Sequence, residues 1–202
     1  MVHKIIFVTS NKGKVATAQQ YFGTTNIKLE TYSHELIEPR SDDITEIAKS
    51  KVLQAYDLVK QPCIAQDSGF YIDALNGFPR AFVNYALETI GIAGILKLMN
   101  GVENRICSFK ECLAYYDGNR IKYFYCNHEG YLSNESIGIE NPEKWSDLWY
   151  IFIPNYSADG RTLAQYTIEE THERRKNNDS SIKQFANWYT IGASDSKLQG
   201  LT

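Results

Sequence analysis

The sequence predicts an α/β fold in which helices and strands form layers. The first 65 residues read as strand, helix, strand, helix, strand, and such alternation is typical of layered α/β folds. Two long strand-like runs then flank the turn sequence Asp117-Gly118-Asn119, which predicts a hairpin. Hydrophobic residues make up 43% of the 202-residue chain, which is ample for a packed core.

The composition excludes several classes of partner. The net charge is −3 and the pI is about 5.8, so the chain has no global basic field for nucleic acid or for an acidic membrane. No apolar run approaches the roughly 18 residues that a membrane helix needs. The cysteines show no C-x-x-C spacing and fall in apolar stretches, which suits buried thiols in a reducing compartment. We therefore expect a cytoplasmic protein whose partner is a small molecule.

The first strand and helix meet at a polar loop. Residues 4–8 form a mainly apolar run and predict a strand, which Thr9-Ser10-Asn11 closes. The same three residues can cap a helix over 12–22. A Gly-containing break follows, and residues 27–32 then predict a second strand.

The second helix leads into the third strand. Acidic and hydroxyl residues at 41–46 are typical of a helix start, and apolar side chains at helical spacing continue to about residue 60. Residues 63–65 then predict a strand. We expect it to end there, because Ser68-Gly69 permits a sharp turn, so that Asp67 projects from the strand's carboxyl end, where ligands gather in open α/β sheets. The alternative is an Asx-type turn in which Asp67 bonds its own backbone.

The second half of the chain predicts one helix, the hairpin, a short apolar run and a final helix. The helices are expected over 87–99 and 167–189, the hairpin strands over 105–116 and 120–132, and the apolar run over 148–153. Residues 191–202 have the pattern of a tail. No linker forces a boundary, so we expect a single domain over 1–202.

Three separated pieces carry polar chemistry: the loop from Thr9 to Lys14, the carboxylate of Glu38, and Asp67-Ser68-Gly69. A polar loop at a helix N-terminus offers free N–H groups, and Lys14 adds a cation, so a phosphate chain fits there. Two carboxylates near a phosphate chain are the usual means of holding Mg²⁺. Taken singly, Lys14 also fits a solvated helix lysine and Glu38 an exposed loop acid.

These pieces resemble motifs of the inosine triphosphate pyrophosphatase family, which hydrolyses deaminated purine nucleoside triphosphates such as ITP, dITP and XTP. The loop Thr9-Ser10-Asn11-x-x-Lys14 is similar to the family's [TS]-x-N-x-x-K, and Glu35-Leu36-Ile37-Glu38 to its D-L-x-E. The most specific likeness is residues 67–79, which resemble D-[ST]-G-L-x-x-D-A-L-x-G-x-P. The resemblance covers most of the chain.

The resemblance implies a fold, a cofactor and a reaction. It implies an elongated mixed central sheet with helices on both sides, two lobes with a cleft between them, Mg²⁺ dependence and a homodimer. Water would attack the α-phosphorus and release pyrophosphate. Asp67 would be the general base and, with Glu38, a metal ligand, while Lys14 would assist as a catalytic cation. The residues implied to hold the substrate are Thr9, Ser10, Asn11, Lys14, Ser68 and Gly69.

The departures from the family pattern cluster where that family recognises the base. Trp149 stands in the place of an aspartate and could either stack on a purine or lie in the core, and Trp145-Ser146-Asp147 could supply the aromatic ring and acid from a shifted register. The family's S-H-R is absent; Lys176 and its neighbours could reach the base or form an exposed helix end. Gln66 replaces an acid before Asp67 and removes a negative charge beside the metal.

The sequence therefore predicts a nucleoside triphosphate pyrophosphohydrolase acting on deaminated or modified purine nucleotides. Two alternatives remain open. One is a catalytically weakened nucleotide-binding protein of the same fold, and the other is a pyrophosphatase with a shifted base preference. A closer link to the Maf-type pyrophosphatases is disfavoured, because their S-x-S-P-R-R loop is absent. The sequence does not name the base, nor does it decide between ribose and deoxyribose.

Overall fold

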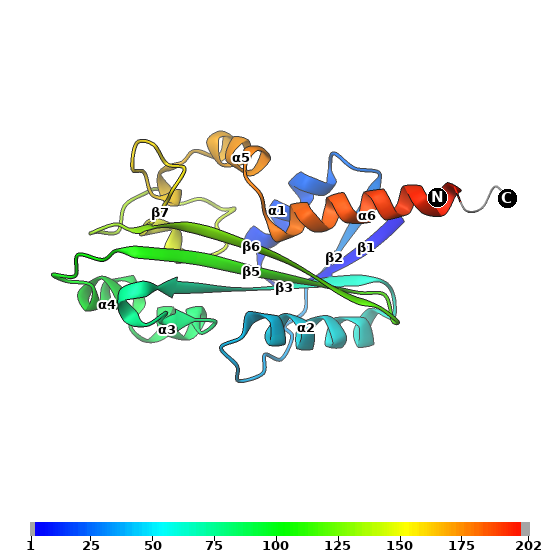
Figure 1. Cartoon of the computed structure of the whole chain (residues 1–202), viewed down its shortest axis with the longest axis horizontal. Helices are drawn as coiled ribbons and strands as arrows, with labels where there is room; N and C mark the ends of the chain where they lie inside the picture. The colour runs from blue at the N-terminus through cyan, green and yellow to red at the C-terminus, as the bar shows by residue number, and fades with distance from the viewer. Residues whose placement is uncertain (1–2, 199–202) are drawn as a thin grey trace.

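The computed structural model describes residues 3–198 and has a long mixed sheet at its centre, which confirms the predicted fold class (Figure 1). The strand order is β2-β1-β3-β5-β6-β7, with β4 paired to β3 beside this path. The strands are β1 His3–Val8, β2 Ile27–Tyr32, β3 Cys63–Ile72, β4 Pro79–Arg80, β5 Ile106–Tyr116, β6 Ile121–Leu132 and β7 Phe152–Pro154. Strands β1, β2 and β3 pair in parallel, whereas β3, β5, β6 and β7 pair antiparallel.

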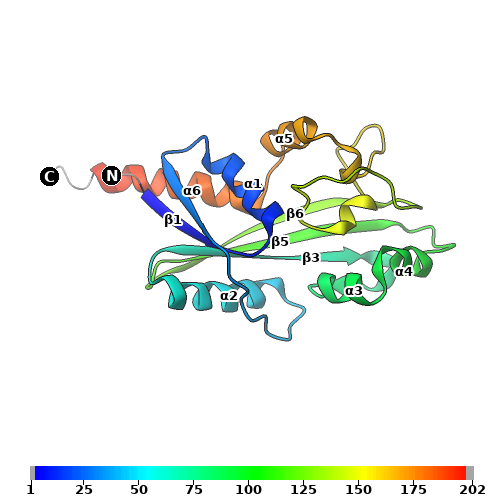
Figure 2. The same cartoon turned by 180° about the vertical axis from the view of Figure 1, so that it is seen from behind.

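Helices cover both faces of this sheet. Helices α1, α5 and α6 lie on one face, and α2, α3 and α4 lie on the other (Figures 1 and 2). The helices are α1 Lys12–Phe22, α2 Ile44–Val59, α3 Val83–Thr89, α4 Gly91–Leu98, α5 Ile168–Asn177 and α6 Ser181–Leu198. Short 3-10 turns occur at η1 Asp73–Leu75, η2 Asp147–Tyr150 and η3 Leu163–Gln165. Among the described residues, no helix is long and apolar enough to cross a membrane.

The apolar core is divided between the two ends of the long sheet. At one end, Phe70, Phe109 and Phe152 pack with the α4 residue Ile95 and with Trp149. At the other end, one cluster joins β1 to α1 and α6, and a second lies beneath α2. The two lobes therefore share β3, β5 and β6 but have separate cores.

Most of the first half of the chain folds as predicted, and the helix caps explain why. The Asn11 side chain caps α1 by accepting a hydrogen bond from the Lys14 amide at 3.0 Å, and Asp43 caps α2 in the same way through the Thr45 amide at 2.8 Å. Strand β2 begins and ends at the predicted residues. The hairpin at 117–119 is also confirmed, since β5 and β6 pair along their whole length.

The prediction that the third strand ends at residue 65 is wrong. Strand β3 continues through Asp67, Ser68 and Gly69 to Ile72 and pairs with β5 throughout. The chain turns only after Ile72, through η1 and the left-handed residue Asn76. Asp67 is therefore held in the middle of a strand rather than at its end.

Two helices that the sequence predicts as continuous are each broken. The helix expected over 87–99 is α3 and α4, separated where Gly91 adopts a φ of +65°, which costs little only for glycine. The helix expected over 167–189 is α5 and α6, because Asn178 is extended and the Ser180 hydroxyl accepts a hydrogen bond from the Lys183 amide at the start of α6. Helix α6 continues to 198, so the expected tail is wrong for 191–198, and 199–202 lie outside the described residues.

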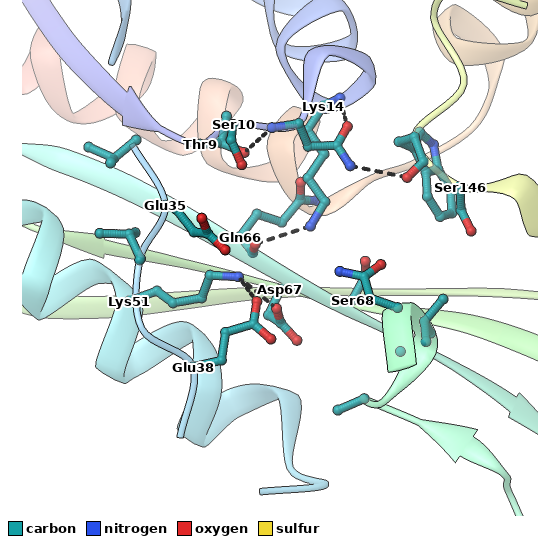
Figure 3. Close-up of a pocket in the computed structure, with 18 of the residues that line it drawn as sticks. Thr9, Ser10, Lys14, Glu35, Glu38, Lys51, Gln66, Asp67, Ser68 and Ser146 are labelled. Carbon is teal, nitrogen blue, oxygen red and sulfur yellow. Dashed lines mark hydrogen bonds and ion pairs between the residues drawn. The ribbon is translucent and has the colours of Figure 1, made fainter. Parts of the chain in front are cut away.

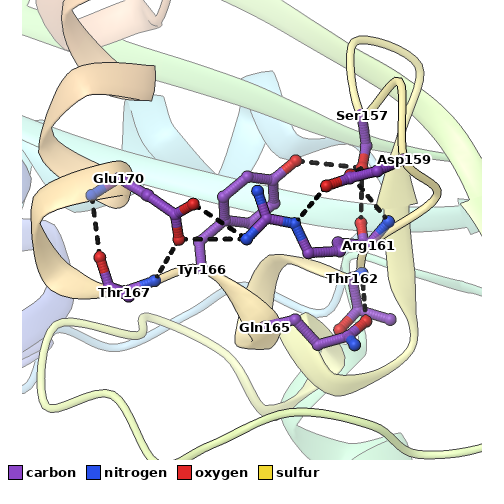
Figure 4. A network of polar contacts seen from close by, with 8 residues as sticks. All are labelled: Ser157, Asp159, Arg161, Thr162, Gln165, Tyr166, Thr167 and Glu170. Atoms are coloured by element: carbon purple, nitrogen blue, oxygen red, sulfur yellow. Dashed lines mark hydrogen bonds and ion pairs between the residues drawn. The ribbon is translucent and has the colours of Figure 1, made fainter.

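A polar network fixes the start of α5 (Figure 4). Thr167 and Glu170 form a capping box, in which each side chain accepts from the other's backbone amide. The Arg161 guanidinium bridges Glu170 at 2.9 Å and Asp159 at 2.6 Å. This network holds the segment after β7 against the start of α5 and so positions that helix.

Candidate active site

Strand β3 has one open edge in the middle of the molecule. It pairs with β1 only at Cys63 and Ile64, and with β4 only at Phe70 and Tyr71. Over 65–69, no described strand pairs with this edge. The open edge borders a cleft of about 710 Å³, lined by the α1 loop, by residues 34–38, by Lys51 of α2 and by Trp145.

The loop before α1 is held rigidly at one side of the cleft. The Thr9 hydroxyl accepts from the Asn11 amide at 3.2 Å, and the Asn11 side-chain amide donates to the Trp145 carbonyl at 3.1 Å. Lys14, in the first turn of α1, extends toward β3 and donates from Nζ to the Gln66 carbonyl at 3.1 Å (Figure 3). The N-terminus of α1 and one ammonium thus lie at the cleft, an arrangement that suits an anion.

Two carboxylates and a second lysine meet on the opposite side of the cleft (Figure 3). The Lys51 ammonium donates to Glu38 Oε1 at 2.6 Å and to Asp67 Oδ1 at 3.1 Å. The Asp67 side chain is 8% exposed and that of Glu38 is 48% exposed. The structure therefore brings Glu38 and Asp67 together, as the sequence predicts, and adds Lys51 between them.

Burial shifts the protonation of these groups. Burial raises the pKa of Asp67, and attraction to Lys14 and Lys51 only partly offsets it. Burial also lowers the pKa of Lys14, against the attraction of Asp67. For Lys51, burial alone would lower the pKa, but the two carboxylates outweigh it and the pKa is raised. Asp67 is thus a carboxylate whose pKa is displaced toward the range of a general base at neutral pH.

Gln66 and Asp67 point to opposite faces of the sheet, because successive side chains alternate along a strand. Asp67 faces α2 and Lys51, whereas the Gln66 amide donates to Ser181 Oγ at 2.9 Å and to Glu111 Oε2 at 3.3 Å. Glu111 also accepts from the Ser181 amide and lies 3.3 Å from His128 Nε2. The Gln66 side chain thus lies on the face opposite the Asp67 carboxylate, with Glu111 rather than Lys51 as its charged neighbour.

The pKa values of the buried pair Glu111 and His128 are strongly shifted in opposite directions. Burial alone would raise the pKa of Glu111, but hydrogen bonds from His128 and Ser181 lower it to about 2. Burial alone would lower the pKa of His128, but hydrogen bonds with Cys126 and Glu111 raise it to about 10. Both groups are therefore charged at neutral pH and form an ion pair beneath the cleft.

Two residues predicted to bind the base lie elsewhere. Trp149 is fully buried in the distal core, so the prediction that it stacks on a purine is wrong, because neither ring face is open to a ligand. Lys176 is exposed on α5, where its ammonium lies 3.7 Å from Glu173, and it does not line the cleft. Trp145, the aromatic residue of the shifted register, does line the cleft, and its ring packs edge-on against Phe109.

Sequence reasoning missed Lys51 and Glu111, although both left a signal. Lys51 lies three residues after Ala48 and four after Ile47, so it occupies the apolar face of α2, where a charge is unexpected. Glu111 lies on the same face of β5 as the buried residues Phe109 and Leu113, because side chains two residues apart along a strand share a face. A charged side chain at a core position of an amphipathic pattern indicates a buried partner or a ligand.

The carboxylates fit a divalent cation. Among the described residues, no group of three or more His, Cys, Asp or Glu side chains could hold a metal ion. Glu38 and Asp67 nevertheless share one cation, the Lys51 ammonium, so both carboxylates face the same point in the cleft. Magnesium is often held by only one or two protein carboxylates together with substrate phosphates. The donor set therefore suits Mg²⁺ in the presence of a phosphate-bearing ligand.

Comparison with known proteins gives a consistent family match. The model of the Ham1 family matches residues 5–188. A dITP/XTP pyrophosphatase of Pyrococcus horikoshii is 34% identical over 191 residues, which cover 93% of this chain and 97% of that protein. One of Saccharolobus solfataricus is 35% identical over 169 residues, covering 83% and 84%. A solved structure of a HAM1 protein from Coxiella burnetii has a TM-score of 0.77 at 21% identity, covers 94% of this chain and 99% of that one, and supports the fold alone.

Proposed function

The chain belongs to the Ham1 family, and we propose that it is a nucleoside triphosphate pyrophosphohydrolase that acts on deaminated purine nucleotides such as dITP and XTP. The observation that carries this proposal is the convergence of Lys14, Glu38 and Asp67 on one cleft beside the open edge of β3. Relatives named as dITP/XTP pyrophosphatases match over most of the chain and supply the substrate class.

The phosphate chain would lie between α1 and β3. The positive N-terminal end of α1 and the Lys14 ammonium would attract phosphate oxygens, and Ser68 lines the same cleft. Thr9, Ser10 and Asn11 would shape this anion site, since the Asn11 side chain fixes both the helix start and the Trp145 backbone. Gly69 keeps β3 close to β4, because a Cβ there would lie 2.8 Å from the Arg80 carbonyl oxygen.

Asp67 would act as the general base. Its raised pKa and its position in the cleft suit removal of a proton from the attacking water. Glu38 and Asp67 would hold Mg²⁺ once Lys51 withdraws from between them. When bound, Mg²⁺ neutralises phosphate charge and polarises the phosphorus under attack. The products would be pyrophosphate and a nucleoside monophosphate.

The base would lie deeper, where a small cavity continues from the cleft beneath Trp145 toward α5. Its lining combines aromatic rings with the guanidinium groups of Arg174 and Arg175. Arg175 is engaged by Glu143, at 2.5 Å, whereas the buried Nε of Arg174 has no partner among the described residues. A keto oxygen on the base would satisfy such a donor. The residues differ from the family's S-H-R, which supports a shifted base preference within the same reaction.

The decisive experiment measures pyrophosphate and monophosphate released from dITP, XTP, ITP and the standard triphosphates with Mg²⁺. We expect turnover of one or more deaminated nucleotides, and we expect Asp67→Asn to lower kcat by roughly 10²–10⁴-fold, the usual contribution of a general base. Asp57→Asn is the matched control, because Asp57 is an exposed acid of α2 that pairs only with Lys60 among the described residues.

The competing possibility is a protein that binds nucleotide without cleaving it. Calorimetric titration with a non-hydrolysable dITP analogue separates the two. Binding without turnover by the folded wild type would overturn the proposed activity and favour the binding protein.

We also propose a cytoplasmic homodimer. The cytoplasmic location is supported by the four free cysteines, three of them buried. Dimerisation is supported by exposed apolar side chains near α3, where Phe82 is 45% and Tyr85 68% exposed. Sedimentation velocity is expected to give the mass of two chains, and a monomer at micromolar concentration would contradict the proposal.

A further inference from the structure

The Gln66 side chain is buried but only half satisfied. The residue is 6% exposed, and its Nε2 donates to Ser181 Oγ at 2.9 Å and to Glu111 Oε2 at 3.3 Å. Its Oε1 is also buried and has no hydrogen-bond partner among the described residues. A buried acceptor without a donor is unfavourable, so such atoms in native proteins usually have a further partner.

The orientation of this amide is fixed by its neighbours. The oxygen and nitrogen of a glutamine amide can often be exchanged without loss of contacts. Here they cannot, because an ionised carboxylate only accepts hydrogen bonds, and Glu111 therefore requires Nε2 rather than Oε1 to face it. Hydrogen bonds from His128 and Ser181 lower the pKa of Glu111 to about 2, against burial, so it is ionised at neutral pH. Oε1 is thus the atom left for another donor.

Gln66 lies between the phosphate end and the base end of the site. It lines the main cleft together with Lys14 and Ser68, and it also lines a smaller cavity with Thr17, Glu111 and Trp145. That smaller cavity shares Thr17, Glu111 and Trp145 with the still deeper one that reaches Arg174. With its phosphates in the main cleft and its base in the deepest cavity, a nucleotide would have its sugar beside Gln66, because the sugar joins these two parts.

The sugar of a nucleotide carries hydroxyl donors and no other hydrogen-bond donor. The two substrates proposed above, dITP and XTP, differ at the 2′ position and share the 3′-hydroxyl. We propose that Gln66 is a specificity-determining residue whose Oε1 accepts a hydrogen bond from the 3′-hydroxyl of the substrate sugar. This proposal rests on the proposed function for the identity of the ligand. Gln66 would thus recognise the sugar, whereas the proposed metal ligand Asp67 lies on the opposite face of β3.

The test compares dITP with its 2′,3′-dideoxy counterpart on the wild type and on Gln66→Met, which keeps the length of the side chain and removes the acceptor. In the wild type we expect kcat/KM to be about 3- to 10-fold higher for dITP, the effect of one hydrogen bond. In Gln66→Met we expect this ratio to fall to about 1. An unchanged ratio would overturn the proposal, as would an equal loss for both substrates, which would point to a base N–H as the donor.

Ser181→Ala is the control for indirect effects. It removes the hydroxyl that donates to Glu111 and accepts from Gln66 Nε2 but leaves Gln66 Oε1 in place, so we expect it to lower stability and to leave the dITP to dideoxy ratio as in the wild type. Circular dichroism and urea unfolding show whether each variant is folded. A loss of stability caused by the altered contacts around Glu111 should appear in both variants. The change in the dITP to dideoxy ratio of kcat/KM should appear only in Gln66→Met.

The outcome stays distinct from that of the proposed function. Absence of turnover with the wild type would overturn the proposed activity but would not decide the role of Gln66. In that case the same ratio is measured as affinity, with α,β-imido analogues of dITP and of the dideoxy compound. Equal binding of the two analogues by the wild type would overturn the role of Gln66 independently of catalysis.

Discussion

Lys51 holds together two carboxylates that would otherwise repel each other, and Lys51→Met is therefore expected to destabilise the free protein. The ammonium lies 2.6 Å from Glu38 and 3.1 Å from Asp67. Since the Glu38 side chain is 48% exposed, solvent screening limits that bond to less than about 1 kcal/mol. The Asp67 side chain is only 8% exposed, and a buried charged hydrogen bond contributes about 2 kcal/mol.

The free energy of unfolding should therefore fall by about 2–3 kcal/mol, which corresponds to a decrease in Tm of roughly 8 °C for a chain of this size. Urea unfolding without metal measures the loss. Lys49→Met is the matched control, because Lys49 is an exposed residue of the same helix. We expect it to change stability by less than about 0.5 kcal/mol.

Added Mg²⁺ makes this prediction more specific. If the metal takes the place of the ammonium between Glu38 and Asp67, then Mg²⁺ should stabilise Lys51→Met more than the wild type, since the variant has no competing cation there. The reasoning is refuted if Lys51→Met is as stable as the wild type without metal. Equal stabilisation of both proteins by Mg²⁺ would refute only the inference that the metal ion and the Lys51 ammonium occupy the same position.

Two further predictions concern the support of the site. Burial alone would lower the pKa of His128, but its hydrogen-bond partners raise it to about 10, so the stabilisation by charged His128 is complete below about pH 6.5 and is lost as the pH rises toward 10. Urea unfolding of the wild type should show this decline in stability with pH, and His128→Gln should show a flatter dependence. If the stabilities of the two proteins depend on pH in parallel, the ion pair with Glu111 is contradicted. Gly13→Ala should lower the free energy of unfolding by about 2 kcal/mol or more and also lower kcat/KM, because the new Cβ would lie 2.5 Å from the Lys144 carbonyl oxygen. The control is Gly23→Ala, at the other end of α1, which should affect activity little. Equal effects of the two substitutions would count against the steric argument.

The first half of the fold could be predicted because its signals are local. Apolar spacing and the caps at Asn11 and Asp43 determine α1 and α2, and both helices begin where these residues place them. Strand β3 could not be predicted in the same way. Gly69 reads as a turn signal, but its small size serves the close approach of β4, whose Arg80 carbonyl lies 2.8 Å from the position of a Cβ. A contact between distant segments, not the local sequence, decides that the strand continues.

In the candidate site, too, local motifs could be predicted and contacts between distant segments could not. Lys14, Glu38 and Asp67 are predictable because each lies in a short motif whose chemistry suits phosphate and a metal ion. Trp149 is misplaced because sequence patterns give the aromatic composition of a segment but not which ring turns toward the core. Lys51 is missed because its role depends on where α2 packs against β3.

Gln66 shows why a residue that departs from a family pattern has to be interpreted in its surroundings. From the sequence, the loss of an acid next to Asp67 predicts a metal ion that is bound more weakly or in another position. In the fold, the Gln66 side chain lies on the face of Glu111, with 3.3 Å between its amide nitrogen and the Glu111 carboxylate. An acid at position 66 would place two buried carboxylates in contact, and one of them would have to take up a proton. Glutamine avoids this repulsion and leaves one acceptor for the substrate. The departure at 66 is therefore explained by the carboxylate at 111, while the Asp67 carboxylate remains on the opposite face of β3, beside Lys51 and Glu38.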